Sequence, residues 1–309
     1  MNSTTNQKSK LTNRIAITIK EGGNGKRPTV YDQITDRIIA MLEKGTVPWQ
    51  KPWKVATGLP RNLISKKPYR GINTLLLHSM SYESPFWLTF HQAQQLGGMV
   101  RKGEKACPVV FGKRVKEQDE QTGEETGYTV LRLYNVFNTA QVDGLKNIPA
   151  TVETPATVST PAEDIIAFMP KRPEIKYGMS KAYYSPSADI IAMPDRARFD
   201  SEAHFFSTIY HEMIHATGSK SRLNRPTLTE SAGFGSNPYC KEELIAEMGA
   251  AFLCGQAGIE NTMENSAAYL SNWLEQLQND KKLIVQAAAQ AQKAADFILG
   301  TKFEDAPAG

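Results

Sequence analysis

The sequence predicts an α+β fold of two domains, in which a small α+β domain precedes a mainly helical one. The chain has 309 residues, which is long for one domain and comfortable for two. Residues 1–146 carry 22 Lys and Arg against 12 Asp and Glu, a net charge of +10, whereas the remainder carries 14 against 20, a net charge of −6. A Pro/Thr/Ala-rich stretch without periodicity, residues 148–163, separates the two parts. We therefore expect two domains with different partners.

Residues 29–147 are predicted to form the small α+β domain, after a flexible basic tail at residues 1–28. Apolar residues at helical spacing predict a first helix that ends at Gly45. Shorter helices are expected at residues 73–80 and 88–96. The segments CPVVFGKRV and YTVLRLYNVFN are rich in β-branched residues and are separated by a polar stretch. They predict a hairpin with a long exposed loop.

Residues 164–309, which follow the linker, predict the mainly helical domain. The segment DIIAMP, Asp189–Pro194, predicts a short strand. This strand either forms the edge along which an extended peptide could bind or is an ordinary sheet edge. Apolar periodicity predicts the helices of this domain at residues 164–169, 201–217, 241–255 and 266–298.

The composition excludes several classes of protein. No apolar run approaches the ~18 residues that span a bilayer, and the polar first thirty residues lack the apolar core of a secretory signal. The three cysteines, Cys107, Cys240 and Cys254, have no CxxC spacing and indicate reduced thiols. We therefore expect a cytoplasmic protein without a membrane partner.

The stretch STIYHEMIHATG contains the pattern His-Glu-x-x-His. Residues four apart share one face of a helix, so His211 and His215 can present two imidazoles to one metal ion. Glu212 would lie beside a water molecule on that ion and could accept its proton. The pattern favours a hydrolase centre with one Zn²⁺, or another divalent transition metal, over two unrelated histidines on a buried helix.

A catalytic zinc site needs a third protein ligand and one open position. Glu243 and Glu247 are again four residues apart, on a helix that otherwise carries apolar side chains. The arrangement resembles that of gluzincins, which implies Glu243 as the ligand and Glu247 as the acid that orients a ligating histidine; the reverse assignment remains open. Glu242 is expected to be solvated, and Cys240 and His204 are weaker candidates for ligands.

A zinc peptidase also gains from a donor that stabilises the developing oxyanion. The sequence does not choose among the four tyrosines available for this role, which are Tyr183, Tyr184, Tyr210 and Tyr239.

A basic stretch with interleaved aromatic residues lies in the first half of the chain. No acidic residue occurs between Glu43 and Glu83. Cations that contact phosphates and rings that stack on unpaired bases are the mixture that single-stranded nucleic acid requires, although any single tryptophan more often lies in the core of a small domain. The candidate DNA-binding residues are Lys44, Trp49, Lys51, Trp53, Lys54, Arg61, Lys66, Lys67, Tyr69, Arg70, Arg101 and Lys102.

Several segments resemble one known family. YDQITDRIIAMLEKGTVPWQKPW, YRGINTLLL and LYNVFNTAQVDGL resemble the N-terminal domain of ArdC-type antirestriction proteins, which conjugative plasmid primases share. YHEMIHATGSKSRLNR and FGSNPYCKEELIAEMGAAFLCG resemble the zincin-like metallopeptidase domain of the same family. The resemblance implies binding of single-stranded DNA and protection of incoming plasmid DNA from host restriction during conjugation. It also implies His211, His215 and one acid of the Glu243/Glu247 pair as metal ligands, with Glu212 as the base.

Two functions remain open at this point. In the first, the peptidase domain cleaves a host restriction protein or another protein bound to DNA. In the second, the protein is a non-catalytic shield on single-stranded DNA, and its zincin domain is structural or inactive. A DNA-processing hydrolase fits less well, because the sequence lacks the clustered carboxylates of a two-metal nuclease site.

Overall fold

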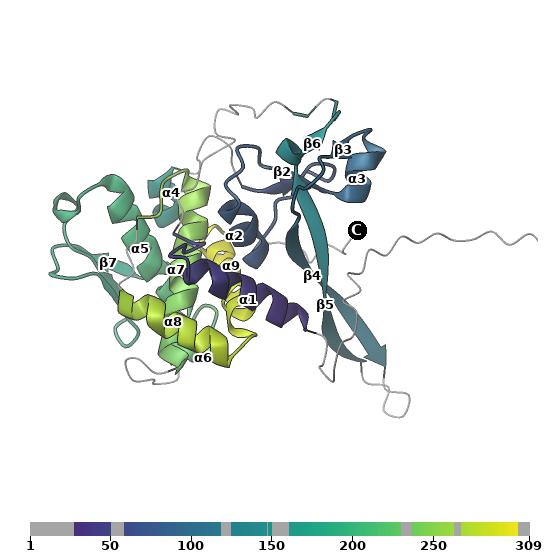
Figure 1. Ribbon diagram of the computed structural model, residues 1–309. Coiled ribbons are helices and arrows are strands. Elements are labelled where there is room, and N and C mark those ends of the chain that lie inside the picture. The colour runs from purple at the N-terminus through teal and green to yellow at the C-terminus, as the bar shows by residue number, and fades with distance from the viewer. Residues whose placement is uncertain are drawn as a thin grey trace, which may run out of the picture.

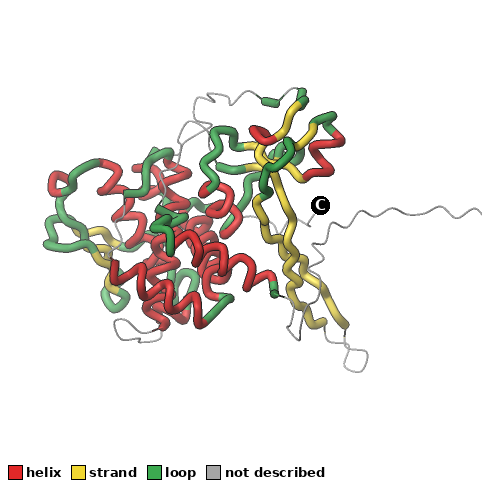
Figure 2. The backbone as a smooth tube through the Cα atoms, in the orientation of Figure 1, coloured by secondary structure: helices red, strands yellow, loops and turns green. Residues whose placement is uncertain are grey.

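The protein consists of a mainly helical lobe beside a smaller lobe built around a sheet (Figures 1 and 2). The structure, a computed structural model, describes residues 28–50, 59–118, 125–146, 148–149, 161–229, 237–262 and 267–301. The predicted α+β class and the mainly helical character of the second half are both confirmed. None of the described helices is long and apolar enough to cross a membrane.

The first half of the chain supplies the sheet of the smaller lobe. Four strands are arranged in the order β1-β2-β5-β4, in which β1 and β2 are parallel and the other neighbours antiparallel. The strands β4 and β5 form the predicted hairpin and project from the lobe (Figure 1). The elements of this half are α1 (Val30–Leu42), β1 (Arg61–Asn62), α2 (Ile72–Ser79), β2 (Phe86–Thr89), α3 (Phe90–Gln95), β3 (Met99–Val100), β4 (Cys107–Gln118), β5 (Glu125–Asn138) and β6 (Val142–Asp143).

The predicted first helix is confirmed as α1, and its start follows from local chemistry. Thr29 and Asp32 form a capping box, in which the Asp32 N–H donates to Thr29 Oγ1 at 3.2 Å and the Thr29 N–H donates to Asp32 Oδ2 at 2.7 Å. The buried side chains of Ile34, Ile38 and Leu42 lie on one face of the helix. Through this face α1 packs against α8 and α9 of the helical lobe.

The second half of the chain forms the helical lobe around a small sheet. Its elements are α4 (Ala162–Ala167), β7 (Glu174–Lys176), β8 (Tyr183–Ser185), β9 (Ile190–Ala192), α5 (Glu202–Thr217), α6 (Pro226–Thr229), α7 (Asn237–Ala257), α8 (Ala267–Asn279) and α9 (Leu283–Ile298). The sheet order is β7-β9-β8, with β7 and β9 parallel and β8 and β9 antiparallel.

Three sequence expectations differ from the structure. The segment DIIAMP was expected at a sheet edge, but its strand β9 lies between β7 and β8. The single helix expected at residues 266–298 is two helices, because the chain turns at Asp280, whose Oδ1 accepts the Lys282 N–H at 2.9 Å. The helix expected at residues 88–96 is shorter, because the apolar run FWLT before it forms the buried strand β2.

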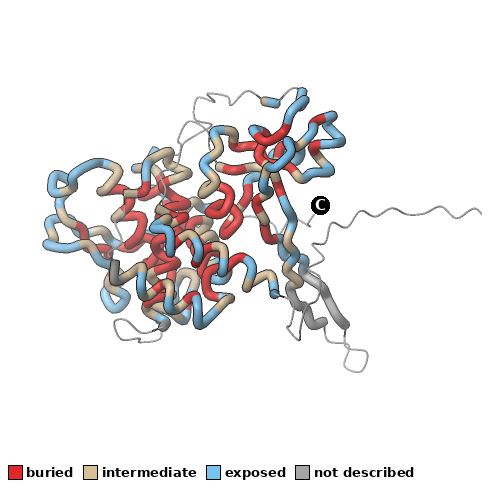
Figure 3. Tube along the Cα trace, in the orientation of Figure 1, coloured by how far each residue is buried: buried red, intermediate tan, exposed pale blue. Residues whose placement is uncertain are grey.

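The two halves of the chain share one hydrophobic core (Figure 3). Trp49 is fully buried, and its ring lies 5.4 Å from that of Trp273 in an edge-to-face arrangement. The Trp49 carbonyl accepts a hydrogen bond from Asn261 Nδ2 at 3.1 Å. Thr35 Oγ1 donates to the Lys281 carbonyl at 2.6 Å. The N-terminal half is therefore anchored to the helical lobe by burial and by hydrogen bonds.

Candidate metal centre

Helix α5 positions both histidines of the His-Glu-x-x-His pattern. Its N-cap is Ser201, whose hydroxyl accepts the His204 N–H at 3.1 Å. From Phe205 onwards nearly all of the helix is buried, and it packs against β8, β9 and α7. His211 and His215 are therefore held on a helix that is fixed from several sides, with exposures of 6% and 9%.

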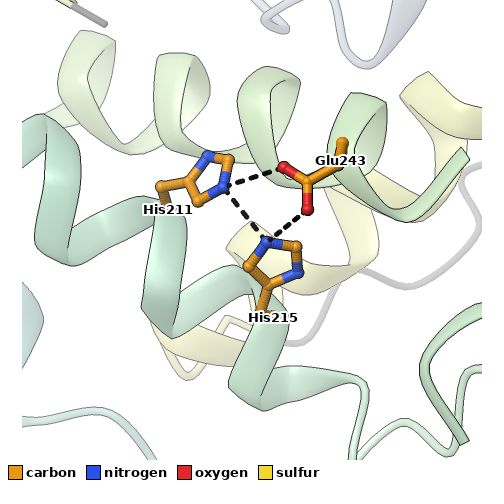
Figure 4. Close-up of side chains that lie close together, drawn as sticks. All are labelled: His211, His215 and Glu243. Carbon is orange, nitrogen blue, oxygen red and sulfur yellow. Dashed lines mark hydrogen bonds and ion pairs between the residues drawn. The ribbon is translucent and has the colours of Figure 1, made fainter. Parts of the chain in front are cut away.

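Helix α7 brings Glu243 to the two histidines (Figure 4). The Nε2 atoms of His211 and His215 lie 3.1 Å apart. Glu243 Oε2 lies 3.5 Å from His211 Nε2, and Glu243 Oε1 lies 3.6 Å from His215 Nε2. The three side chains thus converge on one point, and the acid that contacts both histidines is Glu243.

The spacing of these ligand atoms fits a small divalent ion. Tetrahedral ligands about 2.0–2.1 Å from zinc lie about 3.3–3.4 Å from one another. The two histidine nitrogens lie 3.1 Å apart, and they lie 3.5 and 3.6 Å from different oxygens of Glu243, so all three separations are close to that value. Two imidazoles and one carboxylate also form a donor set that leaves the fourth position of a catalytic zinc ion open.

The electrostatics of the cluster match an ion-binding site. Burial by itself would lower the pKa of His211, but Glu243 and the nearby charges of Glu212 and Glu247 raise it to about 9. Burial by itself would raise the pKa of Glu243, but His211 and His215 lower it below its ordinary value. Without an ion the cluster therefore holds a proton on His211, and a divalent ion that binds there displaces this proton.

A buried network behind His215 corrects the expectation that Glu242 is solvated. Glu242 is only 4% exposed, and its Oε1 lies 3.3 Å from His215 Nδ1. Arg225, 3% exposed, contacts both carboxylate oxygens at 2.5 and 3.1 Å, and Thr227 Oγ1 donates to Oε2 at 2.5 Å. Burial disfavours the charge of Glu242, but His215 and Arg225 lower its pKa to about 2. A charged Glu242 therefore orients the His215 ring.

Arg225 connects this network to the end of α5. Its Nη1 donates to Thr217 Oγ1 at 2.5 Å, and its Nη2 donates to the Ile214 carbonyl at 2.7 Å. The Arg225 side chain lies close to the backbone at the end of α5. A Cβ added at Gly218 would lie only 2.8 Å from Arg225 Nη2. Sequence reasoning missed Arg225 and Thr227. The only signal was the basic run after the motif, and no spacing rule links that run to Glu242.

The helices α5 and α7 approach each other closely at a glycine. A Cβ added at Gly249 would lie 2.6 Å from Ile214 Cδ1 and 2.8 Å from its Cγ1. Ile214 is fully buried, so its side chain has little room to move away. Gly249 therefore permits the interhelical distance at which Glu243 reaches the histidines.

The remaining acids of the predicted site lie beside the cluster. Glu212 is buried, next to His211, and Glu247 is buried one turn beyond Glu243 on α7. Both raise the pKa of His211 through their charge. His211 Nδ1 has no hydrogen-bond partner among the residues that the structure describes. The prediction that Glu247 orients a histidine stays a prediction, whereas the acid in contact with His215 Nδ1 is Glu242.

The structure separates the four candidate tyrosines. Tyr210 is fully buried and donates to the Ala162 carbonyl at 3.0 Å, and Tyr184 donates to Asp189 Oδ1 at 2.7 Å. Tyr183 lies on the exposed side of β8. Tyr239 alone of the four is found in hydrogen-bond contact with Glu243 among the described residues. It therefore joins the cluster from the first turn of α7.

The weaker ligand candidates lie outside the cluster. The described group of possible metal ligands contains His211, His215 and Glu243. His204 is placed near Asp200 at 3.7 Å and packs edge-to-face on Phe199. Cys240 is buried, and its sulfur accepts a hydrogen bond from Asn272.

The basic aromatic stretch divides into exposed and buried parts. Trp49 and Tyr69 were expected to stack on bases, but their exposures of 0% and 6% place them in the core. Arg70 forms an ion pair with Asp296, and Arg101 forms ion pairs with Glu104 and Asp143. Arg61 is half-buried. Candidates on the surface are Lys44, Lys66, Lys67, Arg101 and Lys102, and those outside the described residues are Lys51, Trp53 and Lys54.

Family comparisons divide the chain at the same place as its charge. Residues 28–141 match the family described as the N-terminal domain of anti-restriction factor ArdC. Residues 162–290 match the family described as a zincin-like metallopeptidase. The second match contains the three converging side chains on α5 and α7.

Solved structures with this fold include two of the antirestriction protein ArdC from plasmid R388. The metal-free structure is 39% identical with a TM-score of 0.68, and the match covers 87% of this chain and 96% of that one. The Mn(II)-bound structure is 37% identical with a TM-score of 0.70, and the match covers 88% and 97%.

Relatives by sequence include proteins of very different length. A DNA primase TraC of Escherichia coli is 36% identical over 296 residues, which are 89% of this chain and 27% of the primase. A second TraC from the same species is 34% identical, and 20% of its length is covered. The chain therefore spans about a quarter or less of these primases. An uncharacterized protein, y4eC, of Sinorhizobium fredii is 36% identical, and the match covers 87% of this chain and 91% of y4eC.

Proposed function

This chain belongs to the ArdC family of antirestriction proteins, and on that basis we propose that it binds single-stranded DNA and carries a metal-dependent peptidase centre. In this proposal the protein protects incoming plasmid DNA from host restriction during conjugation. It acts in the bacterial cytoplasm, and its substrate is a host restriction protein or another protein bound to DNA. The observation that supports the catalytic part is the convergence of His211, His215 and Glu243.

The residues of the centre take distinct roles in this proposal. His211, His215 and Glu243 hold a divalent ion, and we favour zinc because two imidazoles and one carboxylate are a ligand set of catalytic zinc sites. When bound, such an ion polarises a carbonyl group and makes a water molecule more acidic. Glu212 accepts the proton of that water, and Glu242 keeps the His215 ring in its orientation.

An edge strand beside the centre offers a place for an extended peptide. β8 is at the edge of its sheet, and α5 packs against it. Arg222 fixes the β8–β9 turn to the end of α5, because its Nη1 and Nη2 donate to the two carboxylate oxygens of Asp189 at 2.8 and 3.0 Å. A substrate strand that pairs with β8 would therefore be held at a fixed distance from His211 and His215.

Replacement of the proposed base tests the catalytic part. Glu212→Gln removes the proton acceptor but leaves the ligating side chains, so we expect the variant to bind metal and single-stranded DNA like the wild type. It should cleave no protein, because the water is no longer deprotonated. Metal content, DNA affinity and cleavage of DNA-bound restriction proteins would be measured on both proteins. Protection of DNA that survives this change in full would show that proteolysis is not the mechanism of protection.

A second function, a non-catalytic shield on single-stranded DNA, is favoured by the shared core. The helical lobe buries Trp49 and holds its carbonyl, so it could serve as a structural support of the DNA-binding half. Deletion of the C-terminal half is therefore a poor test, since it would expose this core. Glu212→Gln in the full chain distinguishes the two functions, because a pure shield protects DNA equally well with either residue.

A further inference from the structure

Two aromatic rings lie exposed on one face of the β4/β5 hairpin. Phe111 is 39% exposed and Tyr134 is 43% exposed. Their ring centroids are 5.5 Å apart, and the planes meet at 82°. Rings of this size usually lie in the core or at an interface, because their apolar faces are costly to leave in water. An exposed pair therefore marks this face as a surface for a flat apolar ligand.

The register of the hairpin places positive charges on the same face. Phe111 pairs with Arg132 across the two strands, so their side chains share one side of the sheet. Lys113 lies two residues after Phe111 on β4, and Tyr134 lies two residues after Arg132 on β5, so both side chains share that side too. Arg132 and Lys113 are exposed. Two cations thus flank two rings.

The acidic residues of the two strands lie only towards the tip of the hairpin, away from these cations. Residues 105–116 and 126–142 contain no Asp or Glu, and the acidic residues of the hairpin begin at Glu117, towards its tip. Exposed rings next to these cations suit a ligand that combines flat bases with phosphates. They suit an acidic or purely apolar peptide less well, because such a peptide would use only one of the two features.

A buried ring supports the inner end of this face, at the junction of the lobes. The Tyr69 ring lies 6.2 Å from that of Phe111. Tyr69 and Arg70 also line a pocket of about 260 Å³ between the two halves of the chain. A strand of nucleic acid on the hairpin would therefore run from Tyr134 past Phe111 towards this pocket.

We propose that this face of β4 and β5 is the surface on which bases of single-stranded DNA stack, with Phe111 and Tyr134 as the stacking rings and Lys113 and Arg132 as phosphate contacts. The inference rests on the proposed binding of single-stranded DNA and assigns it to a surface. Unpaired bases are required, because the bases of a duplex already stack on one another and cannot reach the rings.

Substitution of the rings tests the surface in the full chain. Phe111→Ala and Tyr134→Ala would be titrated against a fluorescently labelled oligothymidylate of about 15 nucleotides, with fluorescence anisotropy as the readout. Phe90→Ala and Tyr183→Ala are matched controls, since Phe90 is 39% exposed and Tyr183 45% exposed away from this face. We expect a loss of affinity of roughly tenfold for each test variant and none for the controls.

Salt dependence separates stacking from phosphate contact. For single strands, each phosphate contact contributes about 0.7 to the slope of log K against log salt concentration. Arg132→Gln should therefore flatten the slope by about 0.7, whereas Phe111→Ala should lower the affinity and leave the slope unchanged. Phe111→Trp keeps an aromatic ring and should keep the affinity, and its added indole should be quenched by the oligomer more strongly than that of Phe90→Trp.

The outcomes distinguish this surface from the general proposal. The assignment of DNA binding to this face would be wrong if the wild type binds the oligomer and Phe111→Ala and Tyr134→Ala bind it equally well. It would also be wrong if the control variants lose as much affinity as the test variants. Either result would leave single-strand binding itself in place. A wild-type protein that binds no oligomer at any salt concentration would overturn both. A duplex of the same length that competes as well as the single strand would contradict stacking on unpaired bases.

Discussion

Two neighbouring acids at the start of α7 have different surroundings. Glu243 points to the Nε2 atoms of both histidines, whereas Glu242 points to the Nδ1 atom of His215 and to Arg225. Successive residues of a helix are rotated by about 100°, so one side chain can reach the proposed ion and the next can reach the network behind it. The pair therefore separates ion binding from support of a ligating ring.

This separation predicts that two isosteric substitutions affect metal binding and stability differently. Glu243→Gln removes a charged ligand, so we expect metal binding to be lost with little change in the stability of the metal-free protein. Glu242→Gln leaves Arg225 buried without its partner charge and should lower the free energy of unfolding by about 3–5 kcal/mol. It should weaken metal binding only about 10- to 100-fold. Urea denaturation and metal titration of the two variants would reveal the contrast, and equal effects in both assays would contradict it.

The lowered pKa of Glu242 predicts how acid affects the stability of the protein. The pKa of Glu242 is about 2 in the folded protein, below its ordinary value of 4.5. A depressed carboxyl pKa contributes stability that is fully present above about pH 4.5 and is lost as the pH falls through about 2. We therefore expect the difference in stability between the wild type and Glu242→Gln to shrink over this acid range.

At the scale of elements, the centre depends on the distance between α5 and α7. The histidines and Glu243 are on different helices, and these helices are in extensive contact. Gly249 removes the side chain that would hold them apart, since any Cβ there would meet Ile214. The spacing of the proposed ligands is therefore set by the packing at Gly249, six residues beyond Glu243 on the same helix.

Gly249→Ala should consequently affect both stability and the centre. The added methyl group overpacks the contact with Ile214, for which we expect a loss of about 1–3 kcal/mol in the free energy of unfolding. It should also lower metal affinity, because Glu243 moves away from His211 and His215. Ile214→Ala combined with Gly249→Ala makes room for the methyl group and should restore part of the metal affinity. A double variant no better than Gly249→Ala would argue against control by helix spacing.

At the scale of the whole molecule, the two halves share one hydrophobic core. One hydrophobic cluster includes residues of α1, α2, β4, α5, α7 and α9. Two hydrogen bonds also join the N-terminal half to the helical lobe, one between Asn261 and the Trp49 carbonyl and one between Thr35 and the Lys281 carbonyl. Metal bound in the second half should therefore stabilise the first half as well, because unfolding of either exposes the same core.

Trp49→Phe tests this continuity. The smaller ring leaves a gap beside Trp273, so we expect a lower melting temperature in calorimetry but still a single transition. Affinity for single-stranded DNA should not change below that transition, because Trp49 is fully buried. Two separate transitions, or weaker DNA binding in the folded variant, would contradict the shared core or the buried role of this ring.

The sequence by itself determined the features that depend on local spacing. The His-Glu-x-x-His pattern predicted a helix with two histidines on one face, and α5 has this form. The apolar face of α1, the long hairpin and the mainly helical second half were also predictable, because each follows from periodicity within a short segment.

Only the tertiary structure decided which distant residues meet. Whether Glu242 is solvated depends on Arg225, 17 residues away, which contacts it in a buried network. Whether Trp49 stacks on DNA or lies in the core depends on Trp273 in the other half of the chain. The exposed ring pair of Phe111 and Tyr134 likewise depends on strand register. Local patterns fix the faces of helices and strands, but burial is a property of the whole packed chain, so the surroundings of single side chains followed only from the fold.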